Sequence, residues 1–261
     1  MKELPAEPPP FPSEILKRGS ADRERVKEWQ SMLAFDADYG IQVDGSFGDE
    51  TVYCTKLFQG FRGLPQTGEV DVVTWDELTN GVNLPKYTRI LTKKFTPAYR
   101  CRVDVICCHT MESPHKKNTA EANATWLAKD DTPKASAHYF VDFDGDIVQS
   151  VRDHHIAWGC PGLNSKGLHI EHAGFARFTR SEWLAGENFI MLQKSAKLSS
   201  EKARKYNVPT KFIDADALKR GERGFTGHKQ GTDAFSAGAG HWDPGPGWPW
   251  DVYLELVRST R

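Results

Sequence analysis

An Asp-Gly pair at positions 144 and 145 is the feature that most constrains the fold of this chain. It stands between two runs rich in apolar and aromatic residues, 137–143 and 146–151. Asp-Gly suits the left-handed backbone of a two-residue turn, so the arrangement predicts a β-hairpin. Other runs predict strands at 102–109 and 168–172, and helices at 119–129, 180–206 (with a break near Gly186) and 250–258. Strands separated by long helices predict an α/β domain with a mixed central sheet flanked by helices.

The N-terminal part has helical periodicity. Val26, Trp29 and Leu33 recur on one helical face. The segment 45–52 is echoed by 68–75, and in both a glycine turn leads into a helix with a threonine at the same offset. Two turn-helix units after a first helix predict a small all-α three-helix bundle. A module of this size is more typical of binding than of catalysis.

The chain has 261 residues, a length that suits a small and a medium domain. Changes in composition along the chain indicate where these domains begin and end. The start is rich in Pro and Glu, which is typical of a disordered lead-in. A polar stretch with Gly and Pro separates the two domains. The predicted segments are the lead-in at 1–13, the three-helix domain at 14–80, the linker at 81–95 and the α/β domain at 96–261.

Charge and cysteine content limit the partners and the compartment. Lys and Arg number 34 and Asp and Glu 35, so no overall field attracts nucleic acid or an acidic membrane. The N-terminus has no basic start followed by an apolar run, and no run is long enough to span a bilayer. We therefore expect synthesis in the cytoplasm without a signal peptide or membrane insertion. Five cysteines without framework spacing predict reduced thiols, with Cys107 and Cys108 in the core.

The N-terminal motifs resemble the peptidoglycan-binding domain type 1 family. The resemblance rests on Trp29-Gln30, Val43 to Gly48, Phe58-Gln59, Thr67-Gly68 and Thr74-Trp75. It implies non-covalent attachment to the bacterial cell wall. The alternative is a helical spacer without a ligand.

Three positions in the α/β domain place a histidine or a carboxylate where an element ends. His109 follows a strand, His228 follows Gly227, and His241 and Asp243 lie in a loop rich in Gly and Pro. Two histidines and one carboxylate suit a catalytic zinc, which keeps one position for water. The spacing His-Glu-x-x-His is absent, so such ligands would come from distant positions. The alternative for each histidine is a structural hydrogen bond.

The order of motifs in this domain resembles the zinc-dependent N-acetylmuramoyl-L-alanine amidase family (amidase type 2). That family shares its fold with the peptidoglycan recognition proteins. The motifs are His109, Ser136 to Tyr139, Asp144-Gly145, Ala157-Trp158, Asn164, Gly167 to Glu171, Gly227-His228 and His241-x-Asp243-Pro244-Gly245-Pro246. With the wall-binding module in front, the whole chain resembles a bacteriophage endolysin.

The resemblance implies zinc ligands, catalytic groups and a substrate. The implied ligands are His109, His228 and Asp243, with Glu171 as general base and His241 as the group that stabilises the oxyanion. Many relatives have lysine at the position of His241. Cys160 is a rival ligand, but its place before Pro161 does not match the relatives that use cysteine. Residues expected to line the substrate cleft are His138, His155, Trp158, Asn164 and His169.

The implied reaction is hydrolysis of the amide between N-acetylmuramic acid and L-alanine of peptidoglycan. One alternative is a protein that recognises peptidoglycan without cutting it, and another is a wall endopeptidase with the same zinc site. Non-catalytic members of the fold lack the third ligand. The joint presence of three ligands and Glu171 therefore favours a hydrolase.

Overall fold

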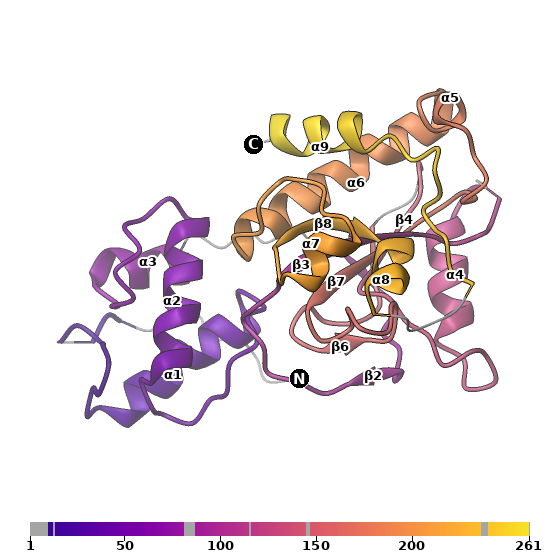
Figure 1. The fold of residues 1–261 in the computed structure, drawn as a ribbon. Coiled ribbons are helices and arrows are strands. Elements are labelled where there is room, and N and C mark those ends of the chain that lie inside the picture. Colours follow the sequence, from indigo (N-terminus) through magenta and orange to yellow (C-terminus); the bar gives the residue numbers. More distant parts are fainter. Residues whose placement is uncertain are drawn as a thin grey trace. The chain divides into compact units, whose positions relative to one another are not determined.

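The computed structural model describes residues 10–12, 14–80, 87–114, 116–144, 147–235 and 240–260. Most of the predicted lead-in and part of the predicted linker lie outside these residues. The chain divides into two compact units, each described by itself below (Figure 1). The first comprises Met1–Lys86 with Tyr99–Cys101, and the second comprises Tyr87–Ala98 with Arg102–Arg261.

The first unit contains three helices, as the sequence predicts. They are α1 (Arg23–Phe35), α2 (Asp49–Phe61) and α3 (Val72–Asn80). Asp22 caps α1, since its side chain accepts a hydrogen bond from the backbone N–H of Arg25. The indole rings of Trp29 and Trp75 stack with centroids 6.0 Å apart, and both side chains are fully buried. Aromatic packing between α1 and α3 thus forms the core of this unit.

Two glutamines explain the internal repeat. The Gln30 side-chain oxygen accepts a hydrogen bond from the backbone N–H of Gly45 at 2.8 Å, and its nitrogen donates to the threonine of the next helix. Gln59 makes the same two kinds of bond one repeat later, with Gly68 at 2.9 Å and the next threonine. Both glycines have positive φ, +75° and +77°, which other L-residues rarely adopt. Each buried glutamine therefore fixes one turn before a helix.

A disulfide joins Cys54 of α2 to Cys101, with Cα atoms 5.8 Å apart. The expectation that all cysteines are reduced is wrong for this pair. The two residues are 47 positions apart, and only the tertiary structure brings the segment Tyr99–Cys101 to α2. Cys107, Cys108 and Cys160 are free and buried.

The second unit is built on a mixed sheet with the strand order β1-β5-β4-β7-β3-β8. Strands β3, β4, β7 and β8 run parallel, and β5 is antiparallel to β4, with Tyr139 opposite Gln149. This register confirms the predicted hairpin and the mixed sheet. The strands are β1 (Thr88–Arg89), β3 (Val105–Thr110), β4 (Tyr139–Val141), β5 (Val148–Gln149), β7 (Gly167–His172) and β8 (Gly224–Gly227).

A separate two-stranded sheet pairs β2 (Phe95–Thr96) with β6 (Ile156–Ala157) in antiparallel fashion. Strand β1 and the start of β2 lie in the stretch predicted as a polar linker. Backbone pairing of β1 with β5 ties that stretch to the second unit. The polar composition of this stretch gives no sign that its backbone pairs with the edge of a sheet. Residues 88–89 therefore form a strand where the sequence predicts a linker.

Helices cover both faces of the main sheet (Figure 1). Phe140 of β4 packs against Ala120 and Ala124 of α4. Its neighbour Tyr139 points to the opposite face, because side chains alternate along a strand, and there it meets Lys202 of α6 and Asp153 of the loop after β5. The helices are α4 (Thr119–Leu127), α5 (Arg180–Trp183), α6 (Gly186–Lys205), α7 (Ala215–Lys219), α8 (His228–Phe235) and α9 (Trp250–Ser259).

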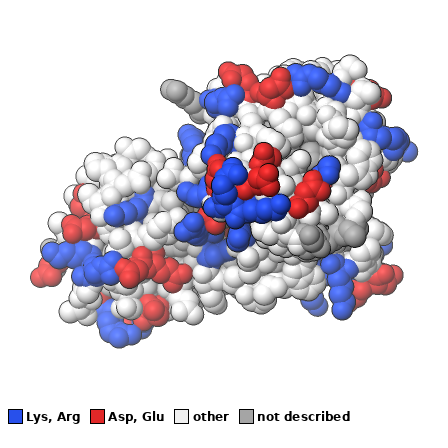
Figure 2. All heavy atoms as spheres, viewed as in Figure 1, with Lys and Arg blue, Asp and Glu red and all other residues white. Residues whose placement is uncertain are grey.

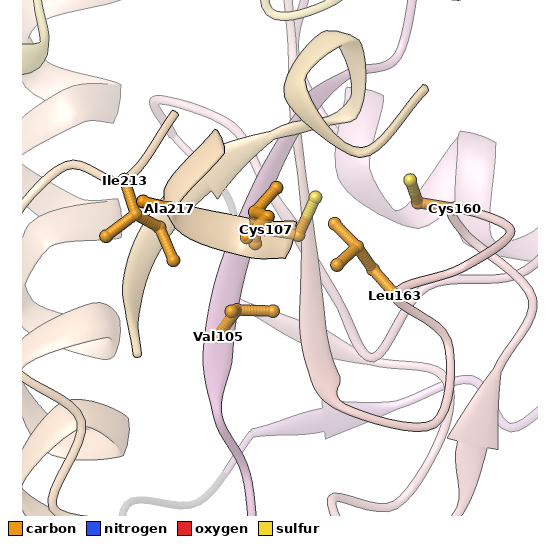
Figure 3. Close-up of a cluster of buried hydrophobic side chains, with 7 residues drawn as sticks. Val105, Cys107, Cys160, Leu163, Ile213 and Ala217 are labelled. Atoms are coloured by element: carbon orange, nitrogen blue, oxygen red, sulfur yellow. The ribbon is translucent and has the colours of Figure 1, made fainter. Parts of the chain in front are cut away.

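Cys107 lies in the hydrophobic core, as predicted. Its side chain belongs to a buried cluster with Val105, Cys160 and Leu163, to which Ile213 and residues of α7 also contribute (Figure 3). On α4, Trp126 is 48% exposed, and the buried alanines Ala120 and Ala124 face the sheet. Small residues allow the helix to approach Phe140 closely.

Acidic and basic side chains are interspersed over the face in Figure 2, in keeping with the net charge of −1. Over the residues that the structure describes, no helix has the length and apolar character needed to cross a bilayer.

Candidate metal centre and active site

Three buried side chains meet near the carboxyl ends of the parallel strands β3 and β8. His109 Nδ1 lies 3.0 Å from Asp243 Oδ2, and His228 Nδ1 lies 3.3 Å from Asp243 Oδ1. Their candidate ligand atoms all lie within 4.8 Å of one another. Imidazole nitrogens and a carboxylate at such distances suit zinc.

The fold brings these residues together from distant positions. His109 lies near the end of β3, and His228 begins α8 directly after β8. The loop with Asp243 packs closely on Gly227, where an added Cβ would lie 2.5 Å from Pro244 Cδ. The backbone N–H of Lys229 donates to Asp243 O at 3.0 Å. A glycine before His228 is therefore needed for the loop to approach.

The electrostatics of the cluster favour a cation. Burial alone would raise the pKa of Asp243, but hydrogen bonds and charge from His109 and His228 outweigh it and hold that pKa well below its usual range. Burial alone would lower the pKa of His228, but hydrogen bonds with Asp243 and Cys160 raise it to about 10. The ionised carboxylate thus attracts a proton to its neighbour. A metal cation that replaces this proton meets the same attraction.

Glu171 lies beside His109 on the neighbouring strand β7, in direct register. Residues paired across parallel strands point to the same face of the sheet, so the carboxyl group lies on the same side of the sheet as the His109 ring. Burial is the largest cause that raises the pKa of Glu171 to about 7, against the lowering effect of His109. Its Oε2 atom is buried and, among the described residues, has no hydrogen-bond partner. A carboxyl group with a pKa near neutrality can exchange a proton with water.

His241 lies at the edge of the cluster and is accessible to solvent. Its ring stacks on His228 with centroids 4.1 Å apart, and its Nδ1 lies 3.8 Å from Asp243 Oδ1. Its side chain is 57% exposed, whereas those of His109 and His228 are buried. The structure therefore separates the exposed His241 from the buried residues His109, His228 and Asp243.

His172 has a role near the site that the sequence analysis missed. Its Nδ1 donates to the backbone oxygen of His109 at 2.8 Å, and its Nε2 lies 2.6 Å from Ser195 Oγ on α6. Burial lowers its pKa to about 3, so the ring is neutral. It fixes the backbone that carries His109. Because side chains alternate along a strand, the sequence could have predicted that His172 points to the other face of the sheet from Glu171, toward the helices.

His138 and His169, which were also expected to line the substrate cleft, are fully buried, and their contact with substrate stays a prediction. His138 Nδ1 accepts a hydrogen bond from the backbone N–H of His169 at 3.0 Å. The His169 Nδ1 atom lies 3.0 Å from His109 Nε2. Both histidines are buried, and His169 contacts the nitrogen of His109 that does not face Asp243.

The other three cleft candidates are partly buried and bonded within the protein. His155 stacks on Phe95 with centroids 4.4 Å apart. The indole nitrogen of Trp158 donates to Thr96 Oγ1 at 2.9 Å. Asn164 accepts hydrogen bonds from the backbone N–H groups of Gly159 and Cys160, which shapes that loop. Their contact with substrate remains a prediction.

Residues 99–246 match the family described as N-acetylmuramoyl-L-alanine amidase, and this match covers more than half of the chain. The chain belongs to the N-acetylmuramoyl-L-alanine amidase family. Residues 22–78 of the amidase match a peptidoglycan binding domain family. Both matches confirm the resemblances found in the sequence.

Individual relatives agree with this family. The amidase is 26% identical to N-acetylmuramoyl-L-alanine amidase A of Achromobacter lyticus over 166 residues, which cover 60% of this chain and 85% of the relative. Among solved structures, Staphylococcus aureus hydrolase AmiA in complex with its ligand matches with a TM-score of 0.51 and 18% identity. The match covers 73% of this chain and 91% of AmiA, and it shows a shared fold. The amidase is thus a cell-wall hydrolase that acts on peptidoglycan.

Proposed function

We propose that the amidase is zinc-dependent and that His109, His228 and Asp243 hold the metal. The observation that carries this proposal is the convergence of two Nδ1 atoms on the two oxygens of one buried carboxylate. When bound, zinc supplies Lewis acidity, which polarises the amide carbonyl and makes water more acidic.

Glu171 acts as the general base in this proposal. It takes the proton of the attacking water and returns it to the leaving amino group of L-alanine. Its pKa near neutrality, its register beside His109 and its partly unbonded carboxyl group support this role. A positioned general base contributes about 10² to 10⁴ in rate.

His241 donates a hydrogen bond to the oxyanion that develops on the carbonyl oxygen. Its exposure at the edge of the metal cluster supports contact with a substrate that arrives from solvent. The Gly-Pro loop supplies both Asp243 and His241, so the donor is held close to the metal.

The first unit attaches the enzyme to the wall, and we propose a lytic role for the whole chain, as in an endolysin. The support is that two different modules on one chain match peptidoglycan families. A binding module keeps the enzyme at an insoluble substrate, where attachment raises the effective concentration.

The test is digestion of purified peptidoglycan by the zinc-loaded wild type and by Glu171→Gln, with zinc content measured for both. We expect the wild type to release new L-alanine amino termini without new reducing ends. Glu171→Gln should keep one zinc per chain and lose at least about 10²-fold in rate. If the loaded wild type binds walls but cuts nothing, the chain is a recognition protein. New amino termini other than those of L-alanine would identify an endopeptidase.

A further inference from the structure

The side of His109 that faces away from the metal cluster contacts a second buried histidine. His109 Nδ1 faces Asp243, and His109 Nε2 lies 3.0 Å from His169 Nδ1. We propose that His169 is a positioning residue, which holds the His109 ring in the orientation and tautomer needed for zinc binding. This inference rests on the proposed function, because it assumes that His109 is a zinc ligand.

The proton count of the two rings supports this role. A nitrogen that binds a metal needs its lone pair, so zinc at Nδ1 leaves the single proton of neutral His109 on Nε2. That proton points at His169 Nδ1, which must then accept it. Ligating histidines nearly always donate their second nitrogen to a fixed acceptor, and such acceptors orient the ring. Here the acceptor is another imidazole.

The ring of His169 lies in a slot that fits it closely. A Cβ added at Gly159 would lie 2.8 Å from His169 Cγ and Nδ1, and one added at Gly167 would lie 3.2 Å from its Nε2. On another side the ring is nearly parallel to His138, with an interplanar angle of 13° and centroids 5.7 Å apart. The close neighbours restrict rotation of the ring.

His138 completes this support behind the site. Its Nδ1 accepts from the backbone N–H of His169, and its Nε2 lies 3.1 Å from the backbone oxygen of His155. A neutral ring that accepts at Nδ1 carries its proton on Nε2, so it donates to that oxygen. Both nitrogens of His138 are therefore satisfied by backbone groups. The row Asp243, His109, His169, His138 runs from the metal cluster into the core.

A rival hypothesis uses the same atoms. Cys107, His109 and His169 also have ligand atoms within 4.8 Å of one another, so they could hold a second metal ion. His109 Nε2 cannot both donate a proton to His169 and bind a metal. The two hypotheses therefore differ in the number of zinc ions per chain and in the effect of substituting Cys107.

The experiment compares His169→Asn with His169→Gln in the full-length protein. The Asn amide reaches about as far as Nδ1, whereas the Gln amide extends about as far as Nε2, so only Asn offers an acceptor at the required place. Zinc affinity is measured by competition with a chromophoric chelator, together with the melting temperature of the zinc-free protein. We expect Gln to weaken zinc binding about 10- to 100-fold and Asn to restore most of it. Zinc-free melting should be similar for both variants.

Two outcomes would overturn the proposal. One is that His169→Asn and His169→Gln, both folded without zinc, bind zinc equally well. The other is that the wild type binds two zinc ions and Cys107→Ser binds one, which would assign these residues to a second metal site. Glu171→Gln serves as the reference for the function itself. Its loss of cleavage with unchanged zinc affinity is independent of either result at His169.

Discussion

At the scale of residues, one short loop supplies groups with two different chemistries. Asp243 is buried between His109 and His228, whereas His241 is exposed beside them. This difference in burial supports the proposed roles, in which Asp243 holds the metal and His241 remains within reach of a substrate. The loop approaches the strand ends only because residue 227 is a glycine.

If His241 donates to the oxyanion, as proposed, another cationic side chain at this position should be able to replace it. His241→Ala should lower kcat about 10²- to 10³-fold, which is the usual effect of removing one oxyanion donor. His241→Lys should keep most of the activity. Zinc content should stay at one per chain in both variants, since His241 is not among the proposed ligands. Equal activity of His241→Ala and the wild type on isolated walls would remove His241 from the mechanism.

At the scale of elements, a buried ionic cluster joins α6 to the loop after β5. Asp153 Oδ2 lies 3.2 Å from Lys202 Nζ and 3.3 Å from Lys205 Nζ, and all three side chains are buried. Tyr139 and Tyr206 donate hydrogen bonds to the same carboxylate. Burial alone would raise the pKa of Asp153, but the two lysines and Tyr139 hold it well below its usual range.

This cluster predicts a specific dependence of stability on pH. Because the pKa of Asp153 is lower in the folded than in the unfolded state, its contribution is present above about pH 4 and is lost as the pH falls below that value. Asp153→Asn should lower the free energy of unfolding by about 3–5 kcal/mol near neutrality, since two buried lysines lose the carboxylate that they share. The difference in the free energy of unfolding between the wild type and the variant should become smaller below about pH 4. Urea unfolding of both proteins from pH 3 to 7 measures it, and a gap independent of pH would contradict the prediction.

At the scale of the whole molecule, one chain joins a unit that matches a peptidoglycan binding family to a hydrolase unit. The first unit includes the segment Tyr99–Cys101, which the Cys54–Cys101 disulfide links to α2. The chain then enters the second unit at Arg102, three residues before β3. The strand that carries His109 therefore begins just after a covalent cross-link.

The cross-link predicts that reduction destabilises the first unit. A disulfide that closes a loop of this length contributes about 4 kcal/mol by restricting the unfolded chain. In calorimetry, a reductant should lower the melting transition of the first unit and leave that of the zinc-loaded second unit nearly unchanged. The Cys54→Ser/Cys101→Ser variant should melt at the lower temperature with or without reductant. Identical melting of the wild type in both conditions would show that the bond does not stabilise the fold.

The sequence by itself determined the local elements and the family, because these depend on short-range patterns. Asp144-Gly145 predicted the hairpin, glycine turns predicted the helices of the first unit, and the order of motifs predicted His109, His228, Glu171 and Asp243 as site residues. The tertiary structure decided which residues meet across long separations. It alone paired Cys54 with Cys101, tied the polar stretch before β2 to a sheet edge, and turned His169 away from solvent toward His109. Strand alternation gave the face of His169, but burial and hydrogen-bond partners depend on the elements that pack over that face.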